Sequence, residues 1–242
     1  MPRKSINFAY IHKNKPACMQ GRPFRNLLVN VYVMPLVHSE IIASNCPLLV
    51  WKLTETLDEL HELLPIYCEN DELASISHPQ KKREWLAGRL VIKYLLEKEG
   101  HIFMGLRKDE HGKPFLLNYD FFISVTHTAE YVAAVLSPQK VIGIDMEKKH
   151  EKLLRTFPRF MSKGELRPDP QQLALLCMYW CGKEAMFKLN GRKKVSFQKD
   201  ISLEPLTAES ITGTARLHDD GQTISAGLHF RWIDDYCLAI AV

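Results

Sequence analysis

The sequence lacks the features of a secreted or membrane protein. Its 242 residues include only six cysteines, none of them in a Cys-x-x-Cys pair, so no disulfide framework is indicated. No apolar run approaches the roughly 18 residues of a membrane-spanning helix. Residues 1–30 are polar and basic, without the apolar core of a secretory leader. We therefore expect a reduced cytoplasmic protein that does not enter a membrane.

The sequence also lacks a strong charge of either sign. The net charge is +4, and charged residues make up 25% of the chain. This balance is compatible with an anionic ligand or an acidic partner, but it is too weak to indicate nucleic-acid binding. Hydrophobic residues, at 46%, are present in ordinary globular proportion. The length suits one large domain or two small ones, and we expect a monomer.

Apolar spacing and turn residues divide the chain into helices and strands. In the first half, the predicted elements are a strand at Leu27–Leu36, a helix at Leu48–Leu64, a helix from about Ser77 to Glu99 and a hairpin at Phe121–Ser137. The second half repeats this plan, with a strand at Val141–Glu147, a helix at Gln171–Leu189 and a hairpin at Leu228–Val242.

Two pairs of segments support an internal duplication. Trp85–Arg89 resembles Tyr179–Lys183, and Glu130–Val135 resembles Asp235–Ile240. We therefore predict an α+β fold of two similar lobes, residues 1–138 and 139–242, related by a pseudo-two-fold axis, as in a dimer made from one chain. A cleft between two such lobes is a natural ligand site.

The end of the predicted strand Val141–Glu147 carries two carboxylates. Asp145 and Glu147 are two residues apart, so on a strand they point to the same side. Their repulsion favours a divalent hard cation such as Mg²⁺ between them. The alternative is a solvated strand end with no function.

The helix predicted at Gln171–Leu189 carries a second polar set. Trp180, Glu184 and Lys188 recur every four residues and therefore lie on one side of the helix. Glu184 and Lys188 could be an ordinary surface ion pair, which contributes only about 0.3–0.5 kcal/mol. Neighbouring Phe187 should instead turn part of this helix toward the core, which would bury the pair partly.

Two further segments suit an anion. His127 lies between Thr126 and Thr128 at the break of the predicted hairpin, and hydroxyls, imidazole and turn amides together suit phosphate oxygens. Lys113 and Pro114 lie in a turn that can hold an anion. A structural histidine and a common loop are the alternatives.

In order and spacing, these four motifs resemble the signature of the 4'-phosphopantetheinyl transferases. The motifs are Gly112-Lys-Pro114, Ser124-Val-Thr-His127-Thr, Ile142-Gly-Ile-Asp145-Met-Glu147 and Trp180-x-x-Lys183-Glu184-Ala-x-x-Lys188-x-x-Gly191. The length and the duplication resemble the surfactin-synthetase-activating type, in which one chain holds both lobes. The resemblance implies the fold of that family, in which each lobe packs an antiparallel sheet against a long helix.

The resemblance also implies a reaction. A phosphopantetheinyl transferase of the holo-acyl-carrier-protein synthase kind moves the 4'-phosphopantetheine arm of coenzyme A to a serine of an acyl or peptidyl carrier protein and releases 3',5'-ADP. By motif, Asp145, Glu147 and Glu184 would bind Mg²⁺, and Glu184 and Lys188 would be catalytic. The implied coenzyme A contacts are Arg83, Arg89, Lys113, Pro114, Thr126, His127 and Lys183, with Arg83 preferred over Arg89.

The chain departs from the family pattern in places. The family usually has serine before the histidine and serine or cysteine after it, whereas this chain has Thr126 and Thr128. Residues 150–170 occupy the segment that contributes to carrier docking in the family, with Phe157, Phe160 and Met161 as a possible apolar contact, although an amphipathic helix packed on the core is equally compatible. Two other functions remain open: a coenzyme A- or carrier-binding homologue without catalysis, and a metal-dependent phosphohydrolase.

Overall fold

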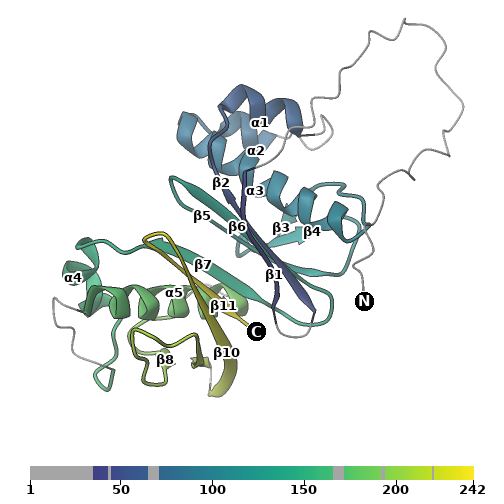
Figure 1. Ribbon diagram of the computed structural model, residues 1–242. Helices are drawn as coiled ribbons and strands as arrows, with labels where there is room; N and C mark the ends of the chain where they lie inside the picture. The colour runs from purple at the N-terminus through teal and green to yellow at the C-terminus, as the bar shows by residue number, and fades with distance from the viewer. Residues whose placement is uncertain (1–34, 43–44, 65–70, 166–171, 192–193, 220) are drawn as a thin grey trace, which may run out of the picture. The chain divides into compact units, whose positions relative to one another are not determined.

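Two antiparallel sheets, each packed against one long helix, form the part of the chain that the structure describes (Figure 1). The structure is a computed structural model that describes residues 35–42, 45–64, 71–165, 172–191, 194–219 and 221–242. Residues 1–26 and nearly all of the strand predicted at Leu27–Leu36 lie outside these ranges. The prediction of an α+β fold with two lobes is confirmed.

The N-terminal sheet has the order β1-β2-β6-β5 and the C-terminal sheet the order β7-β11-β10-β9-β8. The strands of the first are β1 (Leu36–Ile42), β2 (Cys46–Lys52), β5 (Phe122–His127) and β6 (Tyr131–Ser137). The strands of the second are β7 (Gly143–Lys148), β8 (Ile201–Leu203), β9 (Thr212–Asp219), β10 (Gln222–Ile233) and β11 (Tyr236–Ala241). A separate ribbon pairs β3 (Leu106–Lys108) with β4 (Pro114–Leu116).

Two long helices dominate the helical part of the fold. Helix α3 (Pro79–Lys98) begins after His78, whose Nδ1 accepts a hydrogen bond from the Gln80 amide. Helix α5 (Leu173–Asn190) ends at Gly191, which has the left-handed φ of 71° that glycine adopts without strain. The shorter helices are α1 (Leu57–Leu63), α2 (Asp71–Ser75) and α4 (Lys152–Thr156), followed by a 3₁₀ turn at Phe157–Arg159. Among the described residues, no helix has both the length and the apolar character needed to cross a bilayer.

The helix predicted at Leu48–Leu64 is wrong over its first half. Residues up to Lys52 form β2, and the helix α1 starts only at Leu57. Leu49 and Trp51 pack into the core beneath α3, whereas Leu48 and Val50 face the other sheet. A strand buried on both faces shows a continuous apolar run, which periodicity alone cannot distinguish from a buried helix.

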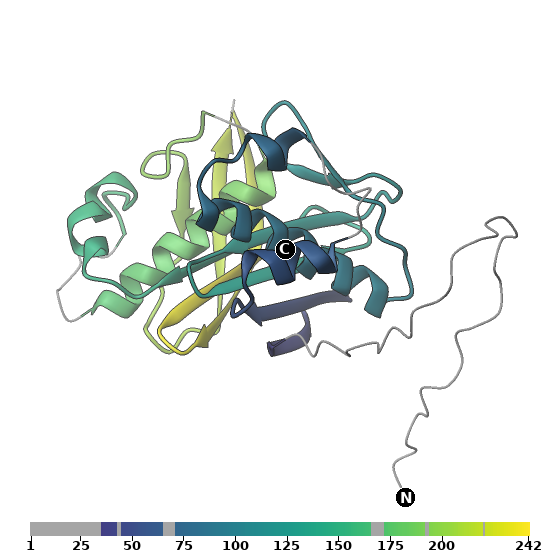
Figure 2. The ribbon, with the colours of Figure 1, turned by 90° about the horizontal axis from the view of Figure 1, so that it is seen from above.

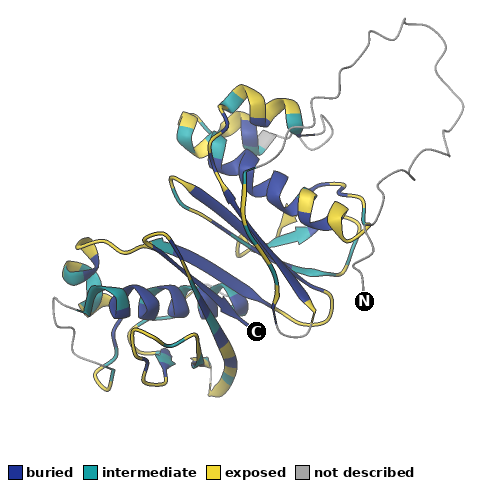
Figure 3. Ribbon diagram, viewed as in Figure 1, coloured by how far each residue is buried: buried dark blue, intermediate teal, exposed yellow. Residues whose placement is uncertain are grey.

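The layers run α3, N-terminal sheet, C-terminal sheet, α5, with a hydrophobic core between each neighbouring pair (Figures 1 and 2). Alternate residues of a strand feed different cores. Val132 and Ala134 of β6 face α3, for example, whereas Ala133 and Val135 face the C-terminal sheet. Figure 3 shows the result: β7, β11 and most of α5 are buried. The two sheets therefore join into one packed unit, Met34–Val242.

Each lobe also sends a tyrosine to a carboxylate of the other lobe. The Tyr131 hydroxyl donates to Asp234 Oδ2 at 2.5 Å, and the Tyr236 hydroxyl donates to Glu130 Oε1 at 2.7 Å. The two rings meet edge to face, 4.9 Å between centroids. The two tyrosines lie in the two segments that resemble each other in sequence. Each of these segments therefore donates a tyrosine hydrogen bond to the hairpin of the other lobe.

This reciprocal pair should make the protein sensitive to alkali. The hydrogen bond to Asp234 raises the pKa of Tyr131 to about 12, and burial with the bond to Glu130 raises that of Tyr236 to about 12. The folded state retains the phenol protons more tightly than the unfolded state. The contribution of the two tyrosines to the free energy of unfolding is therefore complete below about pH 10 and lost toward pH 12. In the double variant Tyr131→Phe, Tyr236→Phe, the free energy of unfolding from urea titrations should fall less between pH 9 and 11 than in the wild type. An identical fall in both proteins would contradict this.

Candidate active site

A cavity of about 930 Å³ lies where β5, the edge of the N-terminal sheet, meets β7, the edge of the C-terminal sheet. Its walls come from α3, β5, β7, α5 and the turn that contains Lys113 and Pro114. Nine of the eleven site residues predicted from the sequence line this cavity. The two that do not are Arg83 and Lys183.

Two hydroxyls connect the edge strands β5 and β7. Ser124 Oγ accepts from the Ile144 amide at 3.0 Å, and Thr126 Oγ1 accepts from the Met146 amide at 3.3 Å. The Thr126 hydroxyl also donates to Asp145 Oδ1 at 3.2 Å. Both side chains are buried, so they satisfy edge amides that would otherwise have no partner. Thr126 thereby orients Asp145 toward the cavity.

Gly143 allows α5 to approach β7 closely. A Cβ at this position would lie 2.0 Å from the carbonyl oxygen of Ala185 and 2.6 Å from the amide nitrogen of Leu189. Because these are backbone atoms of α5, no rotamer change could relieve the clash. The missing side chain therefore brings Glu184 and Lys188, on the same helix, to the wall that carries Asp145 and Glu147.

Three carboxylates share this wall, and burial with repulsion disfavours the ionisation of two of them, Glu147 and Glu184. Burial, followed by the charges of Asp145 and Glu147, raises the pKa of Glu184 to about 7. Burial and the charge of Asp145 also raise the pKa of Glu147. Lys188 opposes this effect, because its Nζ lies 2.7 Å from Asp145 Oδ1. Glu184 is thus a group that can exchange a proton near neutral pH.

The chemistry of this carboxylate set fits a hard divalent cation, which would relieve the repulsion between three acidic groups on one wall. In the structure, the positive charge beside Asp145 is supplied by Lys188. No group of three histidine, cysteine or acidic side chains is close enough to hold a metal within the described ranges. The magnesium role of Asp145, Glu147 and Glu184 thus remains a prediction.

Basic side chains also line the cavity. Arg89 stacks over the Trp85 ring, 3.2 Å from its centroid, and pairs with Glu72 at 3.0 Å. Lys113 donates from Nζ to the carbonyl of Leu189 at 2.8 Å, and burial lowers its pKa. These side chains and His127 are held in fixed positions around a space large enough for several phosphate groups.

The structure corrects the placement of Arg83 and Lys183. Arg83 donates to the carbonyls of Glu55 at 2.6 Å and Leu53 at 2.9 Å, so it fastens the segment between β2 and α1 to α3. Lys183 is completely buried and pairs with Glu165 at 2.7 Å. On α5 it is adjacent to Glu184, but the following residue of a helix points about 100° away. Arg89, rather than Arg83, faces the cavity.

The predicted apolar docking contact is also corrected in part. Phe160 and Met161 are buried in the core beside α5 and cannot serve as an exposed contact. Phe157 remains half-buried, with Arg155 and Arg159 exposed beside it. Residues 166–170 of the segment lie outside the described ranges.

Sequence reasoning missed three residues that shape the site. Ser124 and Gly143 occur inside the recognised motifs, but their roles depend on which strand and helix they meet. Glu84, buried in the cavity wall next to His127, occurs in no recognised motif. Only the hydroxyl residues could have been found from the sequence, because Ser124 and Thr126 are two residues apart and therefore point to the same side of β5.

Comparison with known protein families gives two matches. Residues 141–241 match the model of the 4'-phosphopantetheinyl transferase superfamily, and residues 69–137 match the model of the 4'-phosphopantetheinyl transferase N-terminal domain. No curated protein gives a significant match. The two matches adjoin each other between β6, the last strand of the N-terminal sheet, and β7, the first strand of the C-terminal sheet. Together they cover well over half of the chain, including all four motifs and the residues that line the cavity. The chain therefore belongs to the 4'-phosphopantetheinyl transferase superfamily, a family that transfers phosphopantetheine from coenzyme A to carrier proteins.

Proposed function

We propose that this protein is a magnesium-dependent transferase of the single-chain, surfactin-synthetase-activating type. Its substrates would be coenzyme A and an apo-acyl or apo-peptidyl carrier protein. The observation that carries the proposal is the lining of the cavity, which brings the acidic residue Glu184 together with the basic residues Arg89 and Lys113. Phosphoryl transfer depends mainly on charge neutralisation and positioning, and this arrangement supplies both.

The basic residues of the cavity lining would bind the coenzyme. Arg89, Lys113 and His127 would contact its phosphates, with Pro114 stiffening the turn that presents Lys113. Arg89 is held by the Trp85 ring and Glu72, so its guanidinium loses little freedom when a phosphate binds. Coenzyme phosphates would therefore meet preorganised donors.

The acidic wall would perform the transfer. The carrier serine oxygen attacks the β-phosphorus of coenzyme A, the bond to 3',5'-ADP breaks, and Glu184 accepts the serine proton. A pKa of about 7 suits this exchange at neutral pH. Lys188 would leave Asp145 partly to balance charge on the transferred group. Asp145, Glu147 and Glu184 would hold Mg²⁺, which supplies neutralisation of the diphosphate charge.

The carrier would approach over the segment that contains α4. Phe157 with exposed Arg155 and Arg159 offers a small apolar surface with a basic rim, which suits an acidic carrier protein. We propose the cytoplasm as the location and a monomer as the working state.

Mass spectrometry of apo-carrier proteins would test the proposal. A panel of acyl and peptidyl carriers, incubated with the protein, coenzyme A and Mg²⁺, should gain one phosphopantetheine arm, and the gain should be lost with EDTA. Calorimetric binding of coenzyme A without modification of any carrier would indicate an inactive binding homologue. Coenzyme A breakdown without a carrier would indicate a phosphohydrolase, and either outcome would overturn the proposal.

A further inference from the structure

The cavity contains an acidic residue on the side where the coenzyme phosphates would bind. Glu84 of α3 is only 7% exposed and lines the same cavity as Arg89 and Lys113. A buried carboxylate near a phosphate site is unfavourable unless it acts through a positively charged neighbour.

Glu84 has three neighbours that can donate to it. Oε2 accepts from Lys81 Nζ at 2.7 Å, and Oε1 accepts from Gln80 Nε2 at 3.3 Å. The same Oε2 lies 3.3 Å from His127 Nδ1 at the end of β5. The side chain of Lys81 is 64% exposed and that of His127 43%, whereas that of Glu84 is buried. Because α3 and β5 form adjoining parts of the wall, Glu84 connects them at the position of the histidine.

This contact bears on the protonation state in which His127 can donate a hydrogen bond to a phosphate. An ionised carboxylate only accepts hydrogen bonds, so its position 3.3 Å from Nδ1 favours a proton on that atom. A neutral imidazole then has only a lone pair at Nε2, which repels phosphate oxygens. An imidazolium donates from both nitrogens, one to Glu84 and the other to the ligand.

We infer that Glu84 is a positioning residue that orients His127 and favours its imidazolium form when a phosphate of coenzyme A binds at Nε2. This inference rests on the proposed function of the cavity. The charged groups around His127 are Glu84 and Lys81 on α3, Lys188 on α5 and Asp145 on β7. The pKa of free His127 is lowered, because burial outweighs the opposing charge of Glu84, so protonation is completed only when a phosphate binds, and Glu84 is the fixed charge that favours it.

A double-mutant cycle with coenzyme A as the titrant would test the inference. Glu84→Gln keeps the size and an acceptor oxygen but removes the charge. It should weaken coenzyme A binding about tenfold in calorimetry at pH 7, with the turnover number at saturating coenzyme A changed less than about twofold. In a His127→Ala background, the same substitution should have no further effect, because Glu84 acts through the histidine. NMR titration should also show a lower His127 pKa in Glu84→Gln.

A matched cycle with Lys81→Ala separates the two cationic neighbours of Glu84. Coupling of Glu84 to Lys81 instead of His127, additive effects of Glu84→Gln and His127→Ala, or tighter coenzyme A binding by Glu84→Gln would each overturn the inference. Failure of the wild-type protein to bind coenzyme A would instead overturn the proposed function.

Discussion

Glu184→Gln is expected to lower the turnover number for carrier modification about a thousandfold, within the range typical for loss of a general base. The amide cannot accept the serine proton, but its size is unchanged, so the affinity for coenzyme A should change only slightly. Single-turnover kinetics with a carrier protein and calorimetry with coenzyme A measure the two effects separately. Glu204→Gln is a suitable control, because Glu204 pairs with Arg216 on the surface and lies outside both the motifs and the cavity lining.

The same substitution should stabilise the protein when no divalent cation is added. Burial and the neighbouring carboxylates raise the pKa of Glu184 to about 7, so the folded state binds its proton more tightly than the unfolded state. The free energy of unfolding should therefore fall as the pH rises toward 7, and Glu184→Gln should remove this fall, a gain of roughly 2 kcal/mol at pH 8. Full transferase activity in Glu184→Gln would exclude Glu184 as the base.

Lys183→Met is expected to destabilise the fold by about 3–5 kcal/mol, which is typical when one partner of a buried ion pair is removed. The Lys183 ammonium donates to the carbonyls of Phe160 at 2.7 Å, Ile201 at 2.8 Å and Phe197 at 3.0 Å, besides its pair with Glu165. Methionine has a similar length but no donor, so Glu165 would remain buried without its cation. Urea unfolding followed by tryptophan fluorescence measures the loss.

Two comparisons sharpen this result. Lys93→Met breaks an i,i+4 pair with the half-exposed Glu97 and should cost less than about 0.5 kcal/mol. The double variant Lys183→Met, Glu165→Gln removes both charges and should recover part of the loss. A loss below about 1 kcal/mol in Lys183→Met would show that the buried pair contributes little.

The elements that the sequence predicted well are those with local signals. Helix α3 begins at Pro79, and α5 ends at Gly191, where a proline and a glycine mark the boundaries. The hairpin of β5 and β6 follows from alternation and a break at Thr128. The prediction was wrong at β2 because both faces of this strand are buried, which removes the alternation of apolar and polar residues on which a strand prediction depends. The capping box formed by Thr56 and Glu59 was the missed signal for the true start of α1.

The site shows the same division between local and tertiary information. Spacing alone placed Asp145 with Glu147, and Glu184 with Lys188, on common faces, and all four line one cavity. Arg83 and Lys183 were misplaced because a motif gives the residue but not the direction of its side chain. Both cations satisfy buried carbonyls, and those carbonyls come from segments far away in the sequence.

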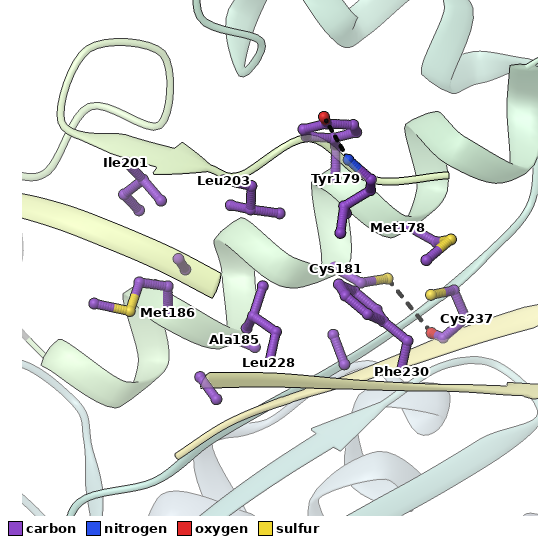
Figure 4. Packing of buried hydrophobic residues seen from close by; sticks show 14 of the residues in the cluster. Met178, Tyr179, Cys181, Ala185, Met186, Ile201, Leu203, Leu228, Phe230 and Cys237 are labelled. Carbon is purple, nitrogen blue, oxygen red and sulfur yellow. Dashed lines mark hydrogen bonds between the residues drawn. The ribbon is translucent and has the colours of Figure 1, made fainter. Parts of the chain in front are cut away.

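The two long helices should differ in their tolerance of an added side chain. Gly182 of α5 packs on Leu203, Leu228 and Phe230, three side chains of the core drawn in Figure 4. A methyl group there would lie 2.7 Å from Leu203, whereas one at Gly88, its counterpart on α3, would meet only Val125 at an ordinary 3.7 Å. Added bulk at Gly88, which lines the cavity, should therefore be tolerated and could adapt the site to smaller coenzyme analogues, whereas a side chain at Gly182 would disturb the core beneath α5.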